Sequence, residues 1–313
     1  MNISVVIPTY NRKLILKKCL LALENQLLNN RINSYEIIVI DDGSTDGTTK
    51  WIKENTEKLP HVVLYEQSHG GPALARNLGV IKSKNEIIIF IDSDLVVVNN
   101  FLVNHVEKLY NYWEKFNKNC FTYGSVINTS NFENPEKENH KITDISFAYF
   151  ATGNVAISRD LLLKVGLFDN SFSLYGWEDL ELGERLKQLG TKIINCPEAK
   201  GFHWHPPFQC EQINSLVRKE SERAKMALIF FNKHPNLRVR FIIQLTFLHR
   251  FLWNLLCLGG IINVRTITPL LDYLVKRKKN SFALELLKIP LNLIYIKELY
   301  KSCLLYTSPS PRD

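Results

Sequence analysis

Four short apolar runs, separated by amphipathic stretches, dominate the first 95 residues of the chain. The runs are rich in β-branched residues, as expected of strands buried on both faces of a sheet, and they occupy residues 3–7, 37–40, 62–65 and 87–91. Apolar residues recur at helical spacing between them, in residues 14–27, 48–58 and 74–84. This repetition predicts an α/β fold with an open, mostly parallel sheet flanked by helices.

Polar residues follow each predicted strand directly, in residues 9–12, 41–46, 67–76 and 92–94. Ligands of open α/β sheets bind outside the carboxyl ends of the strands. We therefore expect the binding site of this protein in these four turns.

The pattern changes near residue 211, where the chain becomes helical and apolar. The stretch 241–264 holds His249 and Arg250 at its centre, where a charge costs a spanning helix about 2.5–3.5 kcal/mol. The stretch 282–295 is short for a membrane span. With the basic run 276–279 between them, the two stretches favour helices that lie on an anionic membrane surface. The alternatives are a helical subdomain that packs on the first domain, or a homodimer contact.

Composition and charge support a folded protein with two dissimilar parts. Of its 313 residues, 45% are hydrophobic and 22% are charged, which excludes disorder and collagen-like repetition. Residues 1–200 hold 22 basic and 24 acidic residues, whereas residues 201–313 hold 17 basic and 7 acidic residues. The positive charge thus lies with the apolar helices, and the chain carries no recognisable nucleic-acid motif, so we expect no nucleic-acid partner.

These observations divide the chain into three parts: a domain at 1–210, a basic helical region at 211–303, and a tail at 304–313. The tail does not continue the preceding pattern and resembles translated sequencing-adapter read-through, so we expect it to be non-native. Six cysteines without a CxxC pair predict reduced thiols. The first strand begins without a secretory leader, and we expect a cytoplasmic protein that is peripheral at the inner face of the cell membrane.

Several of the polar turns carry residue types suited to a nucleotide and a cation. Asp92 and Asp94 stand two residues apart past a strand end, where two carboxylates can share Mg²⁺ or Mn²⁺. Asp41 and Asp42 are placed to meet a base or ribose, or to form an acidic turn that caps the next helix. Arg12, at the end of the first strand, is placed to meet a phosphate.

Six motifs occur in the order in which they occur in family 2 glycosyltransferases, which are inverting nucleotide-sugar transferases of the GT-A fold, and the chain resembles this family over residues 3–207. The motifs are VVIPTYNR at 5–12, VIDDGSTDGT at 39–48, GGPALARNLG at 70–79, FIDSD at 90–94, GNV at 153–155 and GWEDLELGE at 176–184. The resemblance implies that Asp94 is the direct metal ligand and that Asp92 contacts ribose and the metal shell. The expected nucleotide-sugar site comprises Pro8, Thr9, Tyr10, Arg12, Asp41, Asp42, Arg76, Asn77, Asp92 and Ser93.

The pair Glu178-Asp179 is the expected source of the catalytic base. Inversion at an anomeric carbon requires a carboxylate that removes the proton of the acceptor hydroxyl. The resemblance assigns this role to the pair, and we favour Asp179 over Glu178. Glu181 and Glu184 we expect to be exposed acids at the start of a helix.

The remaining expectations concern the metal shell and the two sugars. The resemblance implies a histidine as third metal ligand, with His203 the first candidate and His205 the second. The alternative is that both histidines are neutral residues of a turn. Gly153 and Asn154 are expected to bring backbone close to the donor sugar. Trp177 is expected to stack on the acceptor.

Together these features predict a metal-dependent inverting glycosyltransferase that uses Mn²⁺ or Mg²⁺ and a nucleotide-sugar, most simply a UDP-sugar. Its acceptor is expected to be a glycan or a lipid-linked molecule of cell-surface polysaccharide synthesis. One alternative is a sugar nucleotidyltransferase, which would carry a glycine-rich phosphate loop where this chain has PTYNR. Another is a catalytically idle sugar-nucleotide or glycan-binding scaffold, which would not require both carboxylate pairs.

Overall fold

The computed structural model describes residues 1–139, 144 and 148–307, so that 308–313 of the expected tail lie outside the described residues. The chain forms two compact units. The sheet unit comprises Met1–Ser173 and Glu178–Pro206, and the helical unit comprises Leu174–Trp177 and the chain from Pro207 onward.

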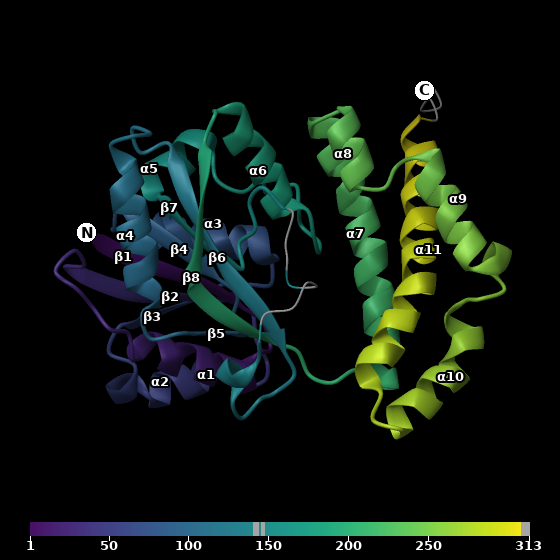
Figure 1. Ribbon diagram of the computed structural model, residues 1–313, viewed down its shortest axis with the longest axis horizontal. Coiled ribbons are helices and arrows are strands. Elements are labelled where there is room, and N and C mark those ends of the chain that lie inside the picture. Colours follow the sequence, from purple (N-terminus) through teal and green to yellow (C-terminus); the bar gives the residue numbers. More distant parts are fainter. Residues whose placement is uncertain (140–143, 145–147, 308–313) are drawn as a thin grey trace. The chain divides into compact units, whose positions relative to one another are not determined.

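The sheet unit is built on a mixed eight-stranded sheet with the order β3-β2-β1-β4-β7-β6-β8-β5 (Figure 1). Its first four strands are parallel to one another and confirm the four predicted strands. β7 is antiparallel to both β4 and β6, and β8 runs parallel to β6 and antiparallel to β5. The strands are β1 (Asn2–Thr9), β2 (Ser34–Asp41), β3 (Val62–Glu66), β4 (Ile87–Ile91), β5 (Leu95–Val97), β6 (Cys120–Thr129), β7 (Asn154–Ser158) and β8 (Lys192–Trp204).

Helices cover both faces of this sheet, because successive side chains of a strand point to opposite faces. On β1, Val5 and Ile7 pack with α1 and α4 in one hydrophobic cluster, whereas Val6 packs with α3, α5 and α6 in another. This explains why the strands read as unbroken apolar runs. The helices are α1 (Lys13–Glu24), α2 (Thr48–Glu54), α3 (Pro72–Lys82), α4 (Phe101–Trp113), α5 (Arg159–Val165) and α6 (Glu178–Gln188).

The helical unit contains five longer helices: α7 (Ile213–Lys233), α8 (Leu237–Ile242), α9 (Phe247–Leu256), α10 (Val264–Lys276) and α11 (Asn280–Thr307). Within this unit α11 is central, with α7 on one side and α9 and α10 on the other (Figure 1). Because α11 ends at Thr307, the first four residues of the expected tail, 304–307, are helical. Among the described residues, no helix is both long enough and apolar enough to cross a bilayer.

The expectation of a surface helix at 282–295 is wrong, because this stretch belongs to α11 and supplies the core of the helical unit. Leu287, Leu291 and Tyr295 are buried there. The other apolar stretch, 241–264, is broken into α8 and α9 by a turn at Gln244, whose backbone is left-handed (φ 61°).

Candidate active site

The functional side chains of the sheet unit meet where its strands end. Thr9 and Asp41 are register partners at the carboxyl ends of β1 and β2. Asp92 directly follows β4, and Asp94 directly precedes β5. Since β5 pairs with the end of β8 so that Leu95 lies opposite His203, this pairing carries His203 to the aspartates that follow β4.

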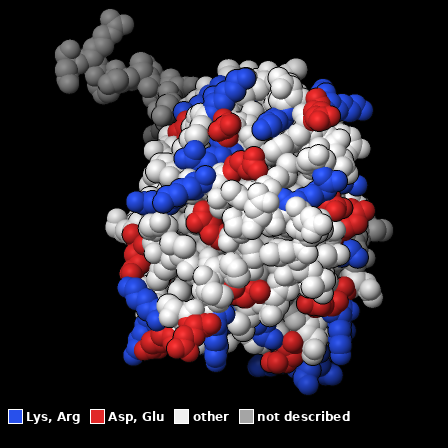
Figure 2. Space-filling view, turned by 90° about the vertical axis from the view of Figure 1, so that its left-hand side faces the viewer, with Lys and Arg blue, Asp and Glu red and all other residues white. Residues whose placement is uncertain are grey.

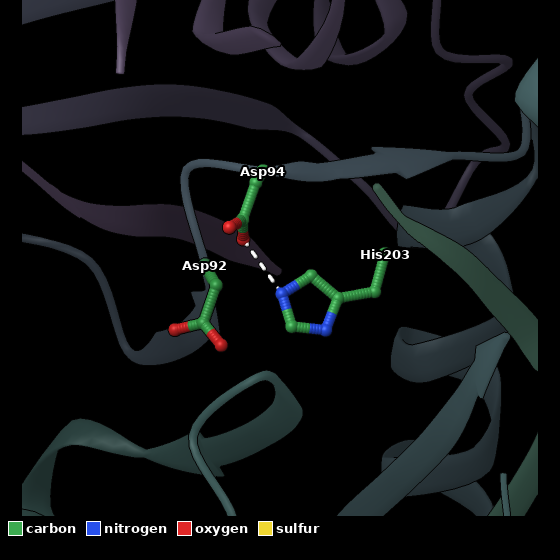
Figure 3. A group of neighbouring side chains, drawn as sticks. All are labelled: Asp92, Asp94 and His203. Atoms are coloured by element: carbon green, nitrogen blue, oxygen red, sulfur yellow. Dashed lines mark ion pairs between the residues drawn. The ribbon is translucent and has the colours of Figure 1, made fainter. Parts of the chain in front are cut away.

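Asp92, Asp94 and His203 form a cluster with the geometry of a metal site (Figure 3). One ligand atom of each lies within 4.8 Å of the others. The Nε2 atom of His203 is 2.8 Å from Oδ1 of Asp94. Two carboxylates and one imidazole fit Mn²⁺ best; Mg²⁺ would use the two carboxylates, since it prefers oxygen ligands, as Ca²⁺ does. The donor set therefore fits the expected divalent cation, with His203 rather than His205 in the third position.

Charge complementarity holds this cluster together. Burial by itself would raise the pKa of Asp94, but the hydrogen bond and charge of His203, with the nearby charge of Arg12, lower it. Burial likewise opposes the charged form of His203, and the hydrogen bond and charge of Asp94 outweigh it and raise the histidine pKa. Arg12 places Nη1 3.6 Å from Oδ2 of Asp94, so the predicted phosphate-binding arginine lies beside the metal cluster.

Arg76 connects the metal cluster to the predicted base. Its guanidinium is buried and donates from Nη2 to Oδ1 of Asp92 and from Nη1 to Oε1 of Glu178, each at 3.0 Å. The second oxygen of Glu178 and the Nε atom of Arg76 are buried without a partner among the described residues. The arginine thus fixes the start of α6 against the turn after β4.

Asp179 differs from Glu178 in its electrostatic surroundings. Burial, and then the charge of Glu178, raise the pKa of Asp179 to about 7. The charge of Arg76 lowers this pKa, but offsets the increase only in part. A general base works best when its pKa lies near the operating pH. Glu178 is committed to Arg76, so this difference favours Asp179 as the proton acceptor.

Where we expect the nucleoside to bind, an aromatic pair follows the ends of β1 and β3. The ring of Tyr10 stacks on His69 with centroids 4.2 Å apart, and both side chains are largely exposed. The Oγ1 atom of Thr9 is buried without a partner among the described residues. Pro8 precedes it near the end of β1, opposite Ile40. A polar ligand at this edge would supply the missing partner for Thr9.

Asp41 and Asp42 organise the loops that frame this edge. Asp41 accepts from the backbone of Ser44 and from the hydroxyl of Thr49, and so stabilises the turn before α2. Asp42 accepts from the backbone N–H groups of Gly70 and Gly71, at 2.8 and 2.9 Å. Both aspartates thus have a structural role in these loops, although α2 has Gly47 as its N-cap and no side-chain capping hydrogen bond, so neither aspartate caps that helix.

Two predicted contact residues are engaged elsewhere. The amide of Asn77 bonds to the backbone of Phe168 and to the side chain of Asn170. Asn154 is fully buried and bonds to His105 and to the carbonyls of Ser125 and Ala199. The structure brings neither side chain into the cluster around Asp92.

Gly153 and Ser93 lie beside the metal cluster. A Cβ atom at Gly153 would stand 3.1 Å from Oδ2 of Asp92, so the absence of a side chain leaves space for this carboxylate. Ser93 is buried in the turn between the two aspartates. His205 bonds through Nε2 to the side chain of Asn128, and its ring lies tilted against that of His203.

Trp177 belongs to the helical unit, one residue before α6. Its indole N–H donates to the carbonyl of Arg223 at 2.8 Å, and its ring lies roughly parallel to that of Phe230 and tilted against that of Tyr295. These contacts hold the ring in the helical unit and leave Trp177 partly exposed. Tyr175, two residues earlier, has the more exposed ring.

The expectation that Glu181 and Glu184 are exposed is wrong. Both are buried, and Glu181 forms a two-pronged pair with Arg185, one helical turn later. Arg185 also donates to the carbonyls of Val165 and Leu167. The acids of α6 thus anchor the helix that carries the predicted base.

Two features of the site were missed by the sequence analysis. His69 lies within the polar stretch 67–76 that was expected to bind ligand, and its position after a strand was the available signal. The bridge from Arg76 to Glu178 joins residues 102 positions apart, and no local pattern announces it.

A profile of Glycosyl transferase family 2 matches residues 4–170, more than half of the chain. A second profile, described as the N-terminal domain of galactosyltransferase, matches residues 138–206. Chondroitin synthase of Pasteurella multocida is 28% identical over 243 residues, which cover 66% of this chain and 25% of that protein. The chain therefore spans about a quarter of the length of this relative.

Solved structures agree on the fold. S. aureus TarS 1–349 in complex with UDP superposes with a TM-score of 0.51 at 16% identity, covering 97% of this chain and 92% of that one. GalNAc-T7 with UDP, GalNAc and Mn²⁺ superposes with a TM-score of 0.52 at 18% identity, covering 66% and 43%. The predicted GT-A fold is confirmed, and with the profile match over residues 4–170 the chain belongs to glycosyl transferase family 2.

Proposed function

We propose that this protein is a metal-dependent inverting glycosyltransferase that moves a sugar from a UDP-sugar to a glycan or lipid-linked acceptor, at the inner face of the cell membrane, in cell-surface polysaccharide synthesis. The observation that carries the proposal is the buried bridge of Arg76, which joins Asp92 of the metal cluster to Glu178, the neighbour of the base. A protein that only bound nucleotide-sugars would not need a carboxylate placed beside the metal cluster in this way.

The donor is proposed to lie across the carboxyl ends of β1, β2 and β4. Tyr10 and His69 offer a stacking surface for the base, and Thr9 offers an unpartnered hydroxyl. Arg12 is placed to meet the diphosphate beside Asp94. A relative that binds UDP at this fold, S. aureus TarS, supports the choice of nucleotide.

Asp92, Asp94 and His203 would hold Mn²⁺ or Mg²⁺. When bound, such a cation neutralises charge that develops on a leaving diphosphate. Arg76 keeps Asp92 oriented by a charge-assisted hydrogen bond, so the carboxylate is preorganised before donor arrives.

Asp179 is the proposed general base. It accepts the proton of the acceptor hydroxyl while the acceptor oxygen forms a bond to the anomeric carbon and the bond from that carbon to the diphosphate breaks. The sugar is transferred to the acceptor with inversion of configuration at the anomeric carbon, and the nucleoside diphosphate departs with the bonding electron pair. A raised pKa allows Asp179 to hold that proton at neutral pH.

The cell-surface polysaccharide assignment is supported by the similarity to chondroitin synthase, which covers two thirds of this chain. The acceptor and the donor sugar are to be found by screening UDP-sugars against glycan and lipid-linked acceptors, with release of UDP as the readout.

The assignments of base and metal are tested with three variants. Asp179→Asn should abolish sugar transfer and keep the thermal stabilisation by UDP with Mn²⁺, because the base is not needed for donor binding. Asp94→Ala should abolish that stabilisation. Asp160→Asn removes an exposed carboxylate on α5 and serves as the matched control.

Full activity of Asp179→Asn would remove the base assignment. An unchanged Mn²⁺ dependence of Asp94→Ala would remove the metal assignment. Stabilisation of the wild-type chain by UDP-sugars without any transfer, across all acceptors, would favour the binding scaffold.

A further inference from the structure

Helix α9 exposes an apolar face that packs against nothing in the described structure. None of its ten residues, all of which are described, is buried. Phe247 is 80% exposed and Phe251 is 53% exposed. The outward residues recur one and three positions apart, which places them on one side of the helix: Phe247, Leu248, Phe251, Leu252, Leu255 and Leu256.

The opposite side of α9 attaches it to the helical unit, so the exposed face has a fixed orientation. Trp253 donates from its indole to Oε1 of Gln244, and Arg250 lies over the ring of Tyr300. The hydroxyl of Thr246 accepts from the backbone of His249 and caps the helix. The exposed apolar surface continues into Leu258 and Ile261, which are 57% and 71% exposed.

Basic residues predominate in the segment of the chain that carries this surface. Residues 237–279, which include α8, α9 and α10, hold eight basic residues and one acidic residue. Four of the basic residues are the exposed run 276–279, which begins at the last residue of α10 and ends just before α11. The surface charge of the sheet unit is different. Figure 2 views this unit from the left-hand side of Figure 1, and basic and acidic side chains are mixed on the face that it shows. Apolar residues flanked by lysine and arginine are the signature of a helix that lies in a membrane interface.

We propose that the α9 face, defined as the outward residues of α9 with Leu258 and Ile261, docks on an anionic phospholipid bilayer. The exposed basic run 276–279 meets the lipid headgroups, and the phenylalanines and leucines enter the boundary between headgroups and acyl chains. A two-fold dimer would bring the same basic surface against itself, so like charges would oppose a second copy of the chain. This proposal specifies the membrane location proposed above and does not rest on the catalytic assignments.

The test is co-sedimentation of the full-length chain with vesicles of phosphatidylcholine, with and without phosphatidylglycerol. We expect binding only to the anionic vesicles, and weaker binding as salt is raised. Phe247→Asp with Phe251→Asp should lower the partition coefficient about tenfold for each phenylalanine. Lys278→Gln with Lys279→Gln should lower it about fivefold for each charge. Ile81→Asp, at a residue of α3 that is 58% exposed, is the matched control and should bind like the wild type.

Stabilisation by UDP with Mn²⁺, measured on each variant, separates the two proposals. A variant that keeps this stabilisation is folded and has its donor site, so its loss of vesicle binding reports on the α9 face alone. Vesicle binding by Phe247→Asp with Phe251→Asp equal to that of the wild type would overturn the proposal. Failure of the wild-type chain to bind anionic vesicles would also overturn it. The same holds if the wild-type chain forms a dimer instead and the double variant dissociates that dimer.

Discussion

Removal of the Arg76 guanidinium should destabilise the sheet unit far more than removal of an exposed cation. The side chains of Arg76 and Glu178 are only 6% and 9% exposed, and their charged atoms are 3.0 Å apart. Loss of one partner from a buried ion pair leaves the other charge uncompensated and costs about 3–5 kcal/mol. Asp92 is 34% exposed, so water screens its ion pair with Arg76, and this pair contributes little to the expected loss of stability.

The variant is Arg76→Met, which retains the length of the side chain and removes its charge. The matched control is Lys50→Met, because Lys50 pairs with Glu54 at 3.7 Å between side chains that are 79% and 59% exposed. An exposed pair of this kind contributes about 0–1 kcal/mol. Urea unfolding in chelator, followed by circular dichroism, gives the free energy of unfolding without a contribution from metal binding.

A second substitution distinguishes the charge from the packing of the long side chain. Glu178→Gln in the Arg76→Met background removes the unpaired charge, and should recover most of the lost stability. The reasoning fails if Arg76→Met destabilises no more than Lys50→Met, or if the double variant is no more stable than Arg76→Met alone.

Three further substitutions test the site. Burial raises the pKa of Asp179 from 3.8 to about 7, so ionisation of Asp179 lowers the free energy of unfolding as pH rises through that range. The melting temperature of Asp179→Asn should therefore exceed that of the wild type at about pH 8 and equal it near pH 4. Each kcal/mol of added stability should raise the melting temperature by about 2–4 °C. Gly153→Ala should raise the Mn²⁺ concentration for half-maximal stabilisation by UDP about tenfold, because its Cβ displaces Asp92; an unchanged titration contradicts this. Asn154→Ala should lower the free energy of unfolding by about 3 kcal/mol, because the buried Nε2 of His105 loses its partner, while UDP binding persists.

The half of the fold that could be predicted is the half whose pattern is local. β1 to β4 are parallel strands covered on both faces, so their sequences are apolar throughout and stand out from the helices between them. The region 99–150 lacks so plain a pattern, and the sequence did not reveal α4 or β6 there. The prediction of a surface helix at 282–295 was wrong for a related reason, because an apolar stretch has the same composition whether it contacts lipid or other helices.

The site divides in the same way. The aspartates 92 and 94 were predictable because both follow one strand, and the proposed role of His203 came only from the family resemblance. The structure explains their meeting through the pairing of β5 with β8. A motif places Asn77 and Asn154 near the site but does not show which partners their amides bind, and the structure commits both amides to neighbouring protein groups.

The segment that precedes the proposed base belongs to the helical unit and has an unusual backbone. Gly176 and Trp177 both adopt left-handed backbone, with φ of 100° and 75°, a conformation that is rare for a bulky side chain. The helical unit sustains this strain by bonding the indole to Arg223 and packing it beside Phe230. The next peptide bond leads to Glu178 and α6. The helical unit therefore fixes the residue that adjoins the proposed base pair Glu178-Asp179, so we expect its fold to matter for the proposed catalysis as well as for the proposed membrane docking.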